Sequence, residues 1–311
     1  MDQERGILII AQGKQRYIHM ARQIAVSLAL SNPHISRALV TDSQDEDLKK
    51  YYDIIIPIDN TLGIGYSQKL CMNKYSPFTK TMFIDVDCLV IDSIDWLFER
   101  FINHPVSVIG KNVMSGPLLG TTVEVLKTKL GINYLPTFNG GVYYFEKGEK
   151  AERVFNEALD IFYNKYDELN LWKFSGQAGD EPAMSIAMAI NNMQPIDDSA
   201  KGMYTPVGQS GVFKMDALKG YCEFYKYDEK VNPAIMHFGG GYPEAFHYKR
   251  ETMKLRWVYH YKIPRTLASF VINLIYNPPY IIYVFLYRII KKIVKGGKLK
   301  FTPIMPMFRF E

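Results

Sequence analysis

Two carboxylates one residue apart, Asp85 and Asp87, follow a short apolar run in the stretch TMFIDVDCLVI. Bulky, partly β-branched residues in so short a run predict a buried strand. Carboxylates at its end need a cationic partner, because a charge taken out of water without one is costly. Alternation along a strand sends residues i and i+2 to the same side, so both side chains could approach one divalent metal ion. A solvated turn at the strand end is the alternative.

The same D-x-D spacing occurs at Asp45 and Asp47, which shows how little the bare pattern says. This second pair lies in the polar run TDSQDEDLKK. Acids at a helix start suit the positive end of the helix dipole, so a capping role explains them. The apolar strand before Asp85 is therefore what favours a metal-binding or phosphate-handling role for the first pair.

Strands and helices alternate along most of the chain. Apolar runs predict strands at 6–11, 37–41, 53–58, from 81, and at 106–110, 137–145 and 234–241. Helical spacing predicts helices at 17–30, 45–52, 66–75, 93–101 (with Ser93 as its cap), 149–163 and from 180. This alternation predicts an α/β fold with a mainly parallel sheet covered by helices on both faces. Ligands of such sheets bind beyond the carboxyl ends of strands, where both Asp85 and the segment 11–13 are expected.

Three later segments carry further candidate residues. The segment 139–141 (Asn-Gly-Gly) enters a strand, where two glycines permit either a close backbone approach to a ligand or only a bulge. Asp180 and Glu181 open a helix ahead of Pro182, and ordinary helix capping uses the same residues. His237 ends a strand before three glycines. A lone histidine is more often structural, but this position favours ligand binding.

The 311-residue chain has a globular composition and a net charge of +5 that resides in its tail. From Arg288 to Glu311 there are seven Lys/Arg and one Glu, so the rest of the chain is slightly acidic. Cys71, Cys88 and Cys222 are odd in number and widely spaced, which favours a reducing compartment over a disulfide framework. The polar start MDQERG predicts no signal peptide.

In their order and spacing these motifs resemble the GT-A nucleotide-sugar glycosyltransferases. The matching elements, over residues 6–241, are strand–A-x-G-x-x-x-Y, the SQKL that contains Lys69, strand–DVD, FNGGV, DE at a helix start, and HFGG. The nearest pattern is glycosyltransferase family 8, the retaining group that includes glycogenin and bacterial lipopolysaccharide galactosyltransferases. The closest part is PFTKTMFIDVDCLVIDSIDWLF at 77–98. The resemblance implies a Rossmann-like, mixed but mainly parallel sheet flanked by helices.

The resemblance also implies a role for each matching residue. Asp85, Asp87 and His237 would bind Mn²⁺ or Mg²⁺, and the ion would carry the donor diphosphate. The other implied donor-binding residues are Ala11, Gln12, Tyr17, Lys69, Val86, Gly140 and Gly240. The implied residues at the reacting sugar are Asn139, Asp180 and Glu181.

The sequence departs from family 8 at two places. Glu181 stands where family 8 usually has Gln. An Asp-Glu pair at this place resembles the blood-group-type retaining transferases instead. A carboxylate there could act as nucleophile or stabilise a cationic transition state. The family's Lys-Pro-Trp, which holds the diphosphate after the metal-binding His, has no counterpart in HFGGGYPEAFHYKR. Lys249 or Arg250 could substitute. This second departure weakens the assignment to family 8 and its retaining stereochemistry.

Residues 247–311 are predicted to form an extension of a catalytic domain at 1–246. The uncharged run Leu267–Leu286 is long enough to span a bilayer. Adjacent prolines at 278 and 279 predict instead two half-length helices that associate with a membrane surface. Interfacial tyrosines and a basic tail suit anionic headgroups: Tyr276, Tyr280, Tyr283, Tyr287, Arg288, Lys291, Lys292, Lys295, Lys298 and Lys300. A true span and a soluble helix pair are the alternatives.

The sequence therefore predicts a metal-dependent glycosyltransferase on the cytoplasmic face of a membrane. It would move a hexose from UDP-Gal or UDP-Glc to a glycan or lipid-linked acceptor, with no nucleic-acid partner. A haloacid-dehalogenase-like phosphatase shares strand–D-x-D but expects Gly-Thr where Cys88-Leu89 stand. A nucleotidyltransferase expects a Gly-rich N-terminal loop, for which the segment 63–65 is too slight. A non-catalytic nucleotide-sugar-binding protein is the remaining alternative.

Overall fold

The computed structural model describes residues 3–174 and 176–295. Contacts divide the chain into two compact units. Unit 1 comprises Met1–Ile18, Ile35–Val86 and Asp95–Ser199, and unit 2 comprises His19–His34, Asp87–Ile94 and Ala200–Glu311. The boundary between the units therefore passes through the D-x-D segment, since Asp85 belongs to unit 1 and Asp87 to unit 2.

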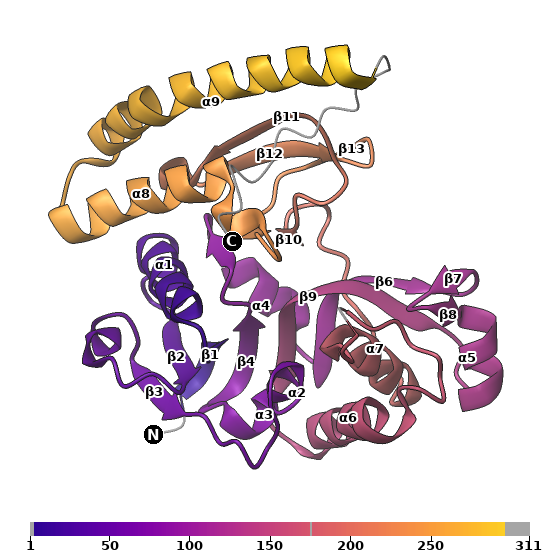
Figure 1. Cartoon of the computed structure of the whole chain (residues 1–311). Helices are drawn as coiled ribbons and strands as arrows, with labels where there is room; N and C mark the ends of the chain where they lie inside the picture. Colours follow the sequence, from indigo (N-terminus) through magenta and orange to yellow (C-terminus); the bar gives the residue numbers. More distant parts are fainter. Residues whose placement is uncertain (1–2, 175, 296–311) are drawn as a thin grey trace. The chain divides into compact units, whose positions relative to one another are not determined.

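Unit 1 is built on a six-stranded sheet with the order β3-β2-β1-β4-β9-β6. Its strands are β1 (Gln3–Ala11), β2 (Ser36–Thr41), β3 (Ile54–Pro57), β4 (Phe78–Ile84), β6 (Val106–Val113) and β9 (Leu135–Glu146). The first four are mutually parallel, whereas β9 runs antiparallel to both β4 and β6 (Figure 1). The predicted mixed, mainly parallel sheet is confirmed.

The helices of unit 1 follow the predicted alternation, with differences at their ends. They are the short helices η1 (Glu46–Lys50), α2 (Tyr66–Lys69) and α3 (Met72–Tyr75), then α4 (Asp95–Phe101), α5 (Val123–Leu130), α6 (Glu149–Asp160), η2 (Ile161–Lys165) and α7 (Asp180–Ile190); the pair β7 (Pro117–Leu118) and β8 (Thr121–Thr122) precedes α5. The helix predicted at 66–75 is in fact two. Ser93 does not begin α4, which starts at Asp95. Asp45 caps η1 by accepting the Asp47 N–H, as predicted.

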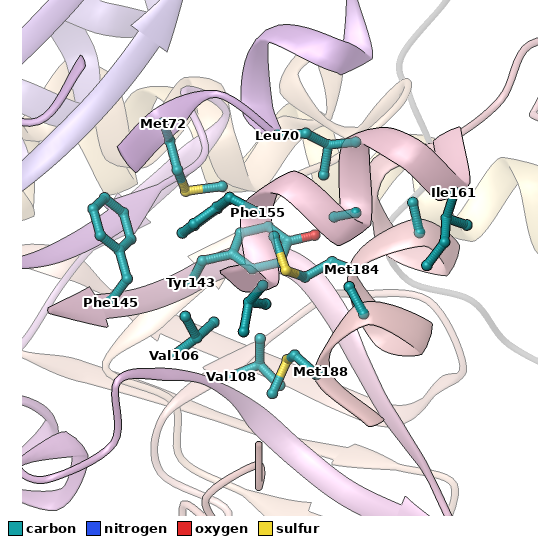
Figure 2. Close-up of a cluster of buried hydrophobic side chains, with 14 of the residues drawn as sticks. Leu70, Met72, Val106, Val108, Tyr143, Phe145, Phe155, Ile161, Met184 and Met188 are labelled. Atoms are coloured by element: carbon teal, nitrogen blue, oxygen red, sulfur yellow. The ribbon is translucent and has the colours of Figure 1, made fainter. Parts of the chain in front are cut away.

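One face of the sheet in unit 1 carries the main apolar core. Alternate residues of β1, β2, β4, β6 and β9 point into it, and they meet apolar residues of α3, α5, α6 and α7. Figure 2 shows its centre, where Tyr143 and Phe145 of β9 lie among Met72, Phe155 and Met184. On the opposite face Tyr144 stacks on Phe101 of α4 at 4.8 Å. Successive residues of β9 therefore pack on opposite faces of the sheet. A shift of one residue would exchange the two sets, so this packing fixes the register of the strand.

Unit 2 contains most of α1 (Gln15–Ser31), two three-stranded sheets and the C-terminal helices. One sheet joins β10 (Met203–Tyr204), β14 (Ile235–His237) and β5 (Cys88–Val90); the other joins β11 (Gln209–Asp216), β12 (Tyr221–Lys226) and β13 (Glu229–Val231). The remaining elements are η3 (Ala217–Lys219), η4 (Tyr242–Glu244), α8 (Phe246–Tyr261) and α9 (Arg265–Lys295). Hydrogen bonds from Val90 N to Ser27 Oγ (3.1 Å) and from Ile94 N to Asn32 Oδ1 (3.0 Å) hold the β5 segment against α1.

The prediction of two half-length C-terminal helices is wrong. α9 is one continuous helix with Pro278 and Pro279 inside it. Its contacts with α8 explain why the prolines do not divide it. The Tyr280 ring stacks on Phe246 at 4.0 Å, and Arg250 donates to Asn277 Oδ1 at 3.0 Å. Packing on both sides of the prolines therefore outweighs the loss of two helical hydrogen bonds.

No helix in the described ranges 3–174 and 176–295 is long and apolar enough to cross a membrane. The outward side of α9 is nevertheless apolar. Its exposed residues include Leu267, Phe270, Leu274, Ile275, Ile281, Ile282, Phe285, Leu286 and Ile289. Of the predicted basic residues, Lys298 and Lys300 lie outside the described residues.

Candidate functional site

The segment Asp85–Asp87 lies in a turn after β4 and not in a strand. The Asp85 N–H donates to Gly141 O at 2.9 Å, and the Val86 N–H donates to Asp85 Oδ1 at 3.1 Å. Strand alternation therefore does not orient the two carboxylates, and that step of the sequence argument is wrong. What the structure retains is their position beyond the carboxyl end of a parallel strand, where ligands of such sheets bind.

Within unit 1, Lys69 of α2 gathers the carboxylates that the sequence singled out. Its Nζ lies 3.0 Å from Asp85 Oδ2 and 3.2 Å from Asp180 Oδ2, and it donates to Gly140 O at 3.0 Å. The ammonium also lies over the Phe83 ring, 5.4 Å from its centroid. Burial alone would lower the pKa of Lys69, but Asp180 and Asp85 outweigh burial and raise the pKa above its usual value. Lys69 is therefore a fixed positive charge in this cluster at neutral pH.

Asp180 and Glu181 do not cap α7. The N-cap is Gly179, and it makes no side-chain cap hydrogen bond. Asp180 Oδ2 accepts the Tyr143 O–H at 2.8 Å, and Glu181 Oε2 accepts the Gly140 N–H at 2.8 Å. Both acids lie in the first turn of α7, and their side chains reach Gly140 and Tyr143 of β9.

Gly140 is glycine because the surrounding side chains leave no room for a Cβ. A Cβ there would lie 2.9 Å from the Tyr143 hydroxyl, 3.2 Å from Asp180 Oδ2 and 3.4 Å from Glu181 Oε2. The neighbouring Asn139 side chain accepts the Gly141 N–H at 3.1 Å. The Asn-Gly-Gly segment therefore serves a close approach between backbone and carboxylates.

Tyr143 and Tyr66 belong to this cluster although the sequence did not single them out. Burial raises the pKa of Tyr143 well above its usual value, and the nearby Asp180 raises it further. Tyr143 therefore stays a neutral hydrogen-bond donor to Asp180. Burial and then Asp180 also raise the pKa of Tyr66. The only sequence signal for Tyr143 was its place three residues after Gly140 in FNGGVYY, and nothing marked Tyr66.

The residues predicted to line the nucleotide lie at the end of β1 and the start of α1. Ala11 ends β1 and is buried. The Gln12 side chain donates to Gly65 O at 3.4 Å, which connects this strand end to the residue before α2. The Arg16 guanidinium lies over the Tyr17 ring, 4.7 Å from its centroid. That Ala11, Gln12 and Tyr17 line the nucleotide stays a prediction.

A second cluster lies within unit 2. His237 Nε2 is 3.0 Å from Asp87 Oδ1, and the Phe238 N–H donates to Asp87 O at 3.0 Å. Cys88 joins them, because ligand atoms of Asp87, Cys88 and His237 all lie within 4.8 Å of one another. A Cβ at Gly239 would lie 3.2 Å from His237 Nε2, so the first glycine after Phe238 accommodates the imidazole. Gly240 has φ +69 with open space around it.

These groups fit a divalent metal ion. A carboxylate oxygen, an imidazole nitrogen and a thiol sulfur are all metal ligands, and they converge here. Asp87 and His237 belong to the metal site that the sequence predicted, whereas Cys88 was not predicted, and its one signal was its position directly after Asp87. Asp85 belongs to no group of three or more converging metal ligands within residues 3–174 and 176–295, and its carboxylate pairs with Lys69 instead.

A hollow of about 510 Å³ in unit 1 lies apart from both clusters. Its lining includes His104, Val106, Lys150 and Arg153. Val106 begins β6 and pairs with Phe145, which in turn pairs with Thr81 in the middle of β4. The lining contains no residue of either cluster and none that the sequence singled out.

Comparisons with known proteins bear on the fold of the chain. No protein-family model matches the sequence, and no curated protein matches it. Among solved structures, an active-site glutamine-to-glutamate variant of LgtC matches with TM-score 0.51 and 14% identity, over 76% of this chain and 87% of that chain. This chain has a GT-A fold. The GT-A assignment also removes the haloacid-dehalogenase-like alternative, since three parallel strands precede β4 in the chain.

Two further matches to this GT-A chain are weaker. The galactosyltransferase LgtC in complex with donor and acceptor sugar analogs gives TM-score 0.49 at 13% identity, over 76% of this chain and 87% of that chain. The glycosyltransferase GlyE of Streptococcus pneumoniae gives TM-score 0.45 at 15% identity, over 63% of this chain. The chain spans only 46% of the GlyE chain.

Proposed function

We propose that this chain is a glycosyltransferase that moves a hexose from a nucleotide diphosphate sugar, UDP-Gal or UDP-Glc, to a glycan or lipid-linked acceptor with retention. The observation that carries the proposal is the position of the two carboxylates at the start of α7. Glu181 accepts the Gly140 N–H, and Asp180 pairs with Lys69. Carboxylates held in this way suit a cationic, oxocarbenium-like transition state, in which developing positive charge needs a fixed negative partner. The GT-A fold supports the same assignment.

Glu181 is the proposed catalytic carboxylate. The Gly140 N–H orients it through Oε2, and α7 fixes its backbone. Asp180 is held by Tyr143 and Lys69 and would bind donor-sugar hydroxyls, with Asn139 as a further sugar contact. Orientation of this kind matters because a misplacement of about 1 Å costs roughly 10²-fold in rate.

Asp87 and His237 would hold Mn²⁺ or Mg²⁺, and Asp85 remains a predicted ligand through the resemblance of its D-x-D motif to family 8. When bound, the ion would neutralise charge on the leaving diphosphate. The chain's own contribution to the donor would come from Lys69 as a fixed cation, from Ala11, Gln12 and Tyr17 at the base, and from the backbone of Val86, Gly140 and Gly240.

The test is release of nucleotide from a panel of UDP-, GDP- and dTDP-sugars by the full-length chain, with and without Mn²⁺ or Mg²⁺. We expect metal-dependent release from UDP-Gal or UDP-Glc, lowered on the order of 10²-fold or more in Glu181→Gln. Glu149→Gln, on the exposed start of α6, is the matched control and keeps full turnover. Donor binding without release would support the non-catalytic binding protein instead. Equal turnover of Glu181→Gln and parent would refute the catalytic role.

We also propose that α9 places the enzyme on the cytoplasmic face of an anionic membrane. Support comes from its exposed apolar residues, from the basic residues that follow them in sequence, and from three buried cysteines that form no disulfide, which suit a reducing compartment. Each Lys or Arg near anionic lipid contributes about 1 kcal/mol. In flotation assays the full-length chain should bind anionic vesicles, and Leu274→Asp with Ile281→Asp should not. Equal flotation of both proteins would disprove this role of α9.

A further inference from the structure

Cys88 has a position in unit 2 that a merely space-filling residue does not need. It is the first residue of β5 and pairs directly with His237 of β14 in an antiparallel register. Directly opposed residues of antiparallel strands point to the same side, with Cβ atoms about 4.5–5.5 Å apart. The thiol therefore points to the same side of this sheet as the imidazole.

The three side chains converge from different parts of the backbone. Asp87 comes from the turn before β5, Cys88 from the strand itself and His237 from the end of β14. Their ligand atoms lie within 4.8 Å of one another, and Asp87 Oδ1 and His237 Nε2 are already 3.0 Å apart. Ligands bound to one zinc-sized ion at about 2.0–2.3 Å would have such separations after small side-chain movements.

The environment of the thiol is also specific. Cys88 is fully buried, as is Leu89 after it. Buried cysteines often serve as small apolar residues. That role does not require a buried histidine as the cross-strand partner, nor the glycine at 239 that leaves space for the imidazole.

We propose that the Cys88 thiolate is a ligand of the metal ion held by Asp87 and His237. The inference deepens the proposed function, because it specifies the ion that the glycosyltransferase site selects. On binding, the thiol gives its proton to solvent, and the sulfur lone pair forms the bond to the ion. No oxidant or reductant takes part.

A thiolate changes which metals the site prefers. Mg²⁺ requires octahedral oxygen ligands, whereas an oxygen, nitrogen and sulfur set suits Co²⁺ and Zn²⁺. Affinity for divalent ions at nitrogen, oxygen and sulfur sites rises from Mn²⁺ to Co²⁺. We therefore expect Mg²⁺ to bind most weakly, Mn²⁺ more tightly, and Co²⁺ and Zn²⁺ most tightly.

The test uses the metal alone with the full-length chain and no sugar donor. Co²⁺ should give a thiolate-to-cobalt charge-transfer band in the near ultraviolet. Cys88→Ser should lose the band, and Cys222→Ser, a change at another buried cysteine of unit 2, should keep it. Zn²⁺ affinity should fall in Cys88→Ser by more than the roughly 10–100-fold typical of losing a neighbour of a ligand.

X-ray absorption at the zinc edge of the unaltered chain needs no variant. One sulfur at about 2.3 Å from Zn²⁺ is expected. Bound Zn²⁺ without a sulfur neighbour, or an unchanged cobalt band in folded Cys88→Ser, would overturn the inference. None of these measurements reads turnover. A chain that binds Zn²⁺ through sulfur but releases no nucleotide would refute the proposed function and leave this inference intact.

Discussion

Two clusters of buried opposite charges, one in each unit, differ in how completely the protein encloses them. In unit 1 Lys69 faces Asp85 and Asp180, and the side chains of Lys69 and Asp85 keep 14% and 23% of their surface exposed. In unit 2 Lys254 of α8 pairs with Glu251 at 3.0 Å, and neither side chain has any exposed surface. The first cluster is accessible to a ligand and the second is not.

The cluster of Arg250, Glu251 and Lys254 in unit 2, called the enclosed cluster below, satisfies its charges through its own hydrogen bonds. Glu251 Oε1 accepts from Arg250 Nε at 2.7 Å and from Lys254 Nζ, and its Oε2 accepts the Ala217 N–H at 2.8 Å. Arg250 also donates to Met215 O at 2.7 Å and to Asn277. These bonds connect α8 to β11, η3 and α9, so the network serves the packing of unit 2. Arg250, considered above as a substitute for the missing phosphate-binding lysine, is committed to it.

Buried charge alone therefore does not identify a functional site. Both clusters combine cations and carboxylates at hydrogen-bonding distance. What separates them is the backbone around them. The cluster in unit 1 lies beside a glycine that admits no Cβ and beyond the end of a parallel strand. The enclosed cluster in unit 2 connects α8 to α9, β11 and η3, so its hydrogen bonds serve packing.

The largest expected effect is on the enclosed cluster. Glu251→Gln removes the charge that faces both Arg250 and Lys254, and an uncompensated buried charge costs about 3–5 kcal/mol in free energy of unfolding. Chemical denaturation measures the loss. The control is Glu223→Gln on β12, an acid between Lys214 and Lys230 at the surface, which should change little. Equal stability of Glu251→Gln and parent would mean that the network does not hold unit 2 together.

Asp180→Asn in unit 1 should lower nucleotide release strongly and the free energy of unfolding only slightly. Lys69 keeps Asp85 and Gly140 O as partners, so the free energy of unfolding should fall by less than in Glu251→Gln. Nucleotide release should fall on the order of 10²-fold, because the donor sugar loses its fixed partner. Steady-state kinetics and denaturation on the same preparation separate the two effects. A variant that unfolds easily yet turns over normally when folded would invert the comparison.

Gly140→Ala tests the close approach between backbone and carboxylates in unit 1. The added methyl group must displace the Tyr143 hydroxyl or the two carboxylates, and overpacking of this kind costs about 1–3 kcal/mol. We expect reduced nucleotide release together with a moderate fall in melting temperature. Gly179→Ala is the control, since a Cβ there would meet Pro182 at an ordinary 3.5 Å. If both alanine variants behave alike, close approach at Gly140 has no functional meaning.

The smallest effect concerns His247 beside the enclosed cluster. Its ring lies 4.7 Å from Phe213 and 5.3 Å from Tyr280, and burial, then Arg250 and Lys254, hold its pKa well below its usual value. The unfolded chain therefore takes up a proton near pH 6.5 that the folded chain refuses. The free energy of unfolding should fall by up to about 1.4 kcal/mol per pH unit below pH 6.5.

His247→Phe should remove this pH dependence between about pH 6.5 and 5. His34→Gln, at an exposed position of unit 2, should leave it unchanged. Denaturation at a series of pH values measures both. An unaltered pH slope in His247→Phe would place its origin elsewhere.

The sequence allowed the fold to be predicted where local pattern decides structure. The apolar runs of β1, β2 and β4 and the helical spacing of α1 are local, and the structure confirms them. The single helix α9 was missed because the contacts with α8 that hold it, at Phe246 and Arg250, are visible only in the folded chain. Tertiary packing there outweighs the local preference against proline.

The candidate site was predictable only as a set of residues. Asp180, Glu181 and the Asn-Gly-Gly segment were identified by type and position, but their pairing was not. Lys69 bonds to residues 16 and 71 positions away in the chain, and no local pattern indicates such partners. Cys88 was missed for the same reason, since its relation to His237 depends on the register between β5 and β14.

The two prolines within α9 also bear on how deeply this helix could enter a lipid surface. Proline has no N–H, so the carbonyl groups of Leu274 and Ile275 lose the donors that residues 278 and 279 would otherwise supply. Both residues are exposed on the outward side. Carbonyl groups without a helical donor need water, and water is absent from the hydrocarbon region. On a membrane, as proposed above, the prolines would therefore limit the depth of α9 and keep its middle at the level of the hydrated headgroups.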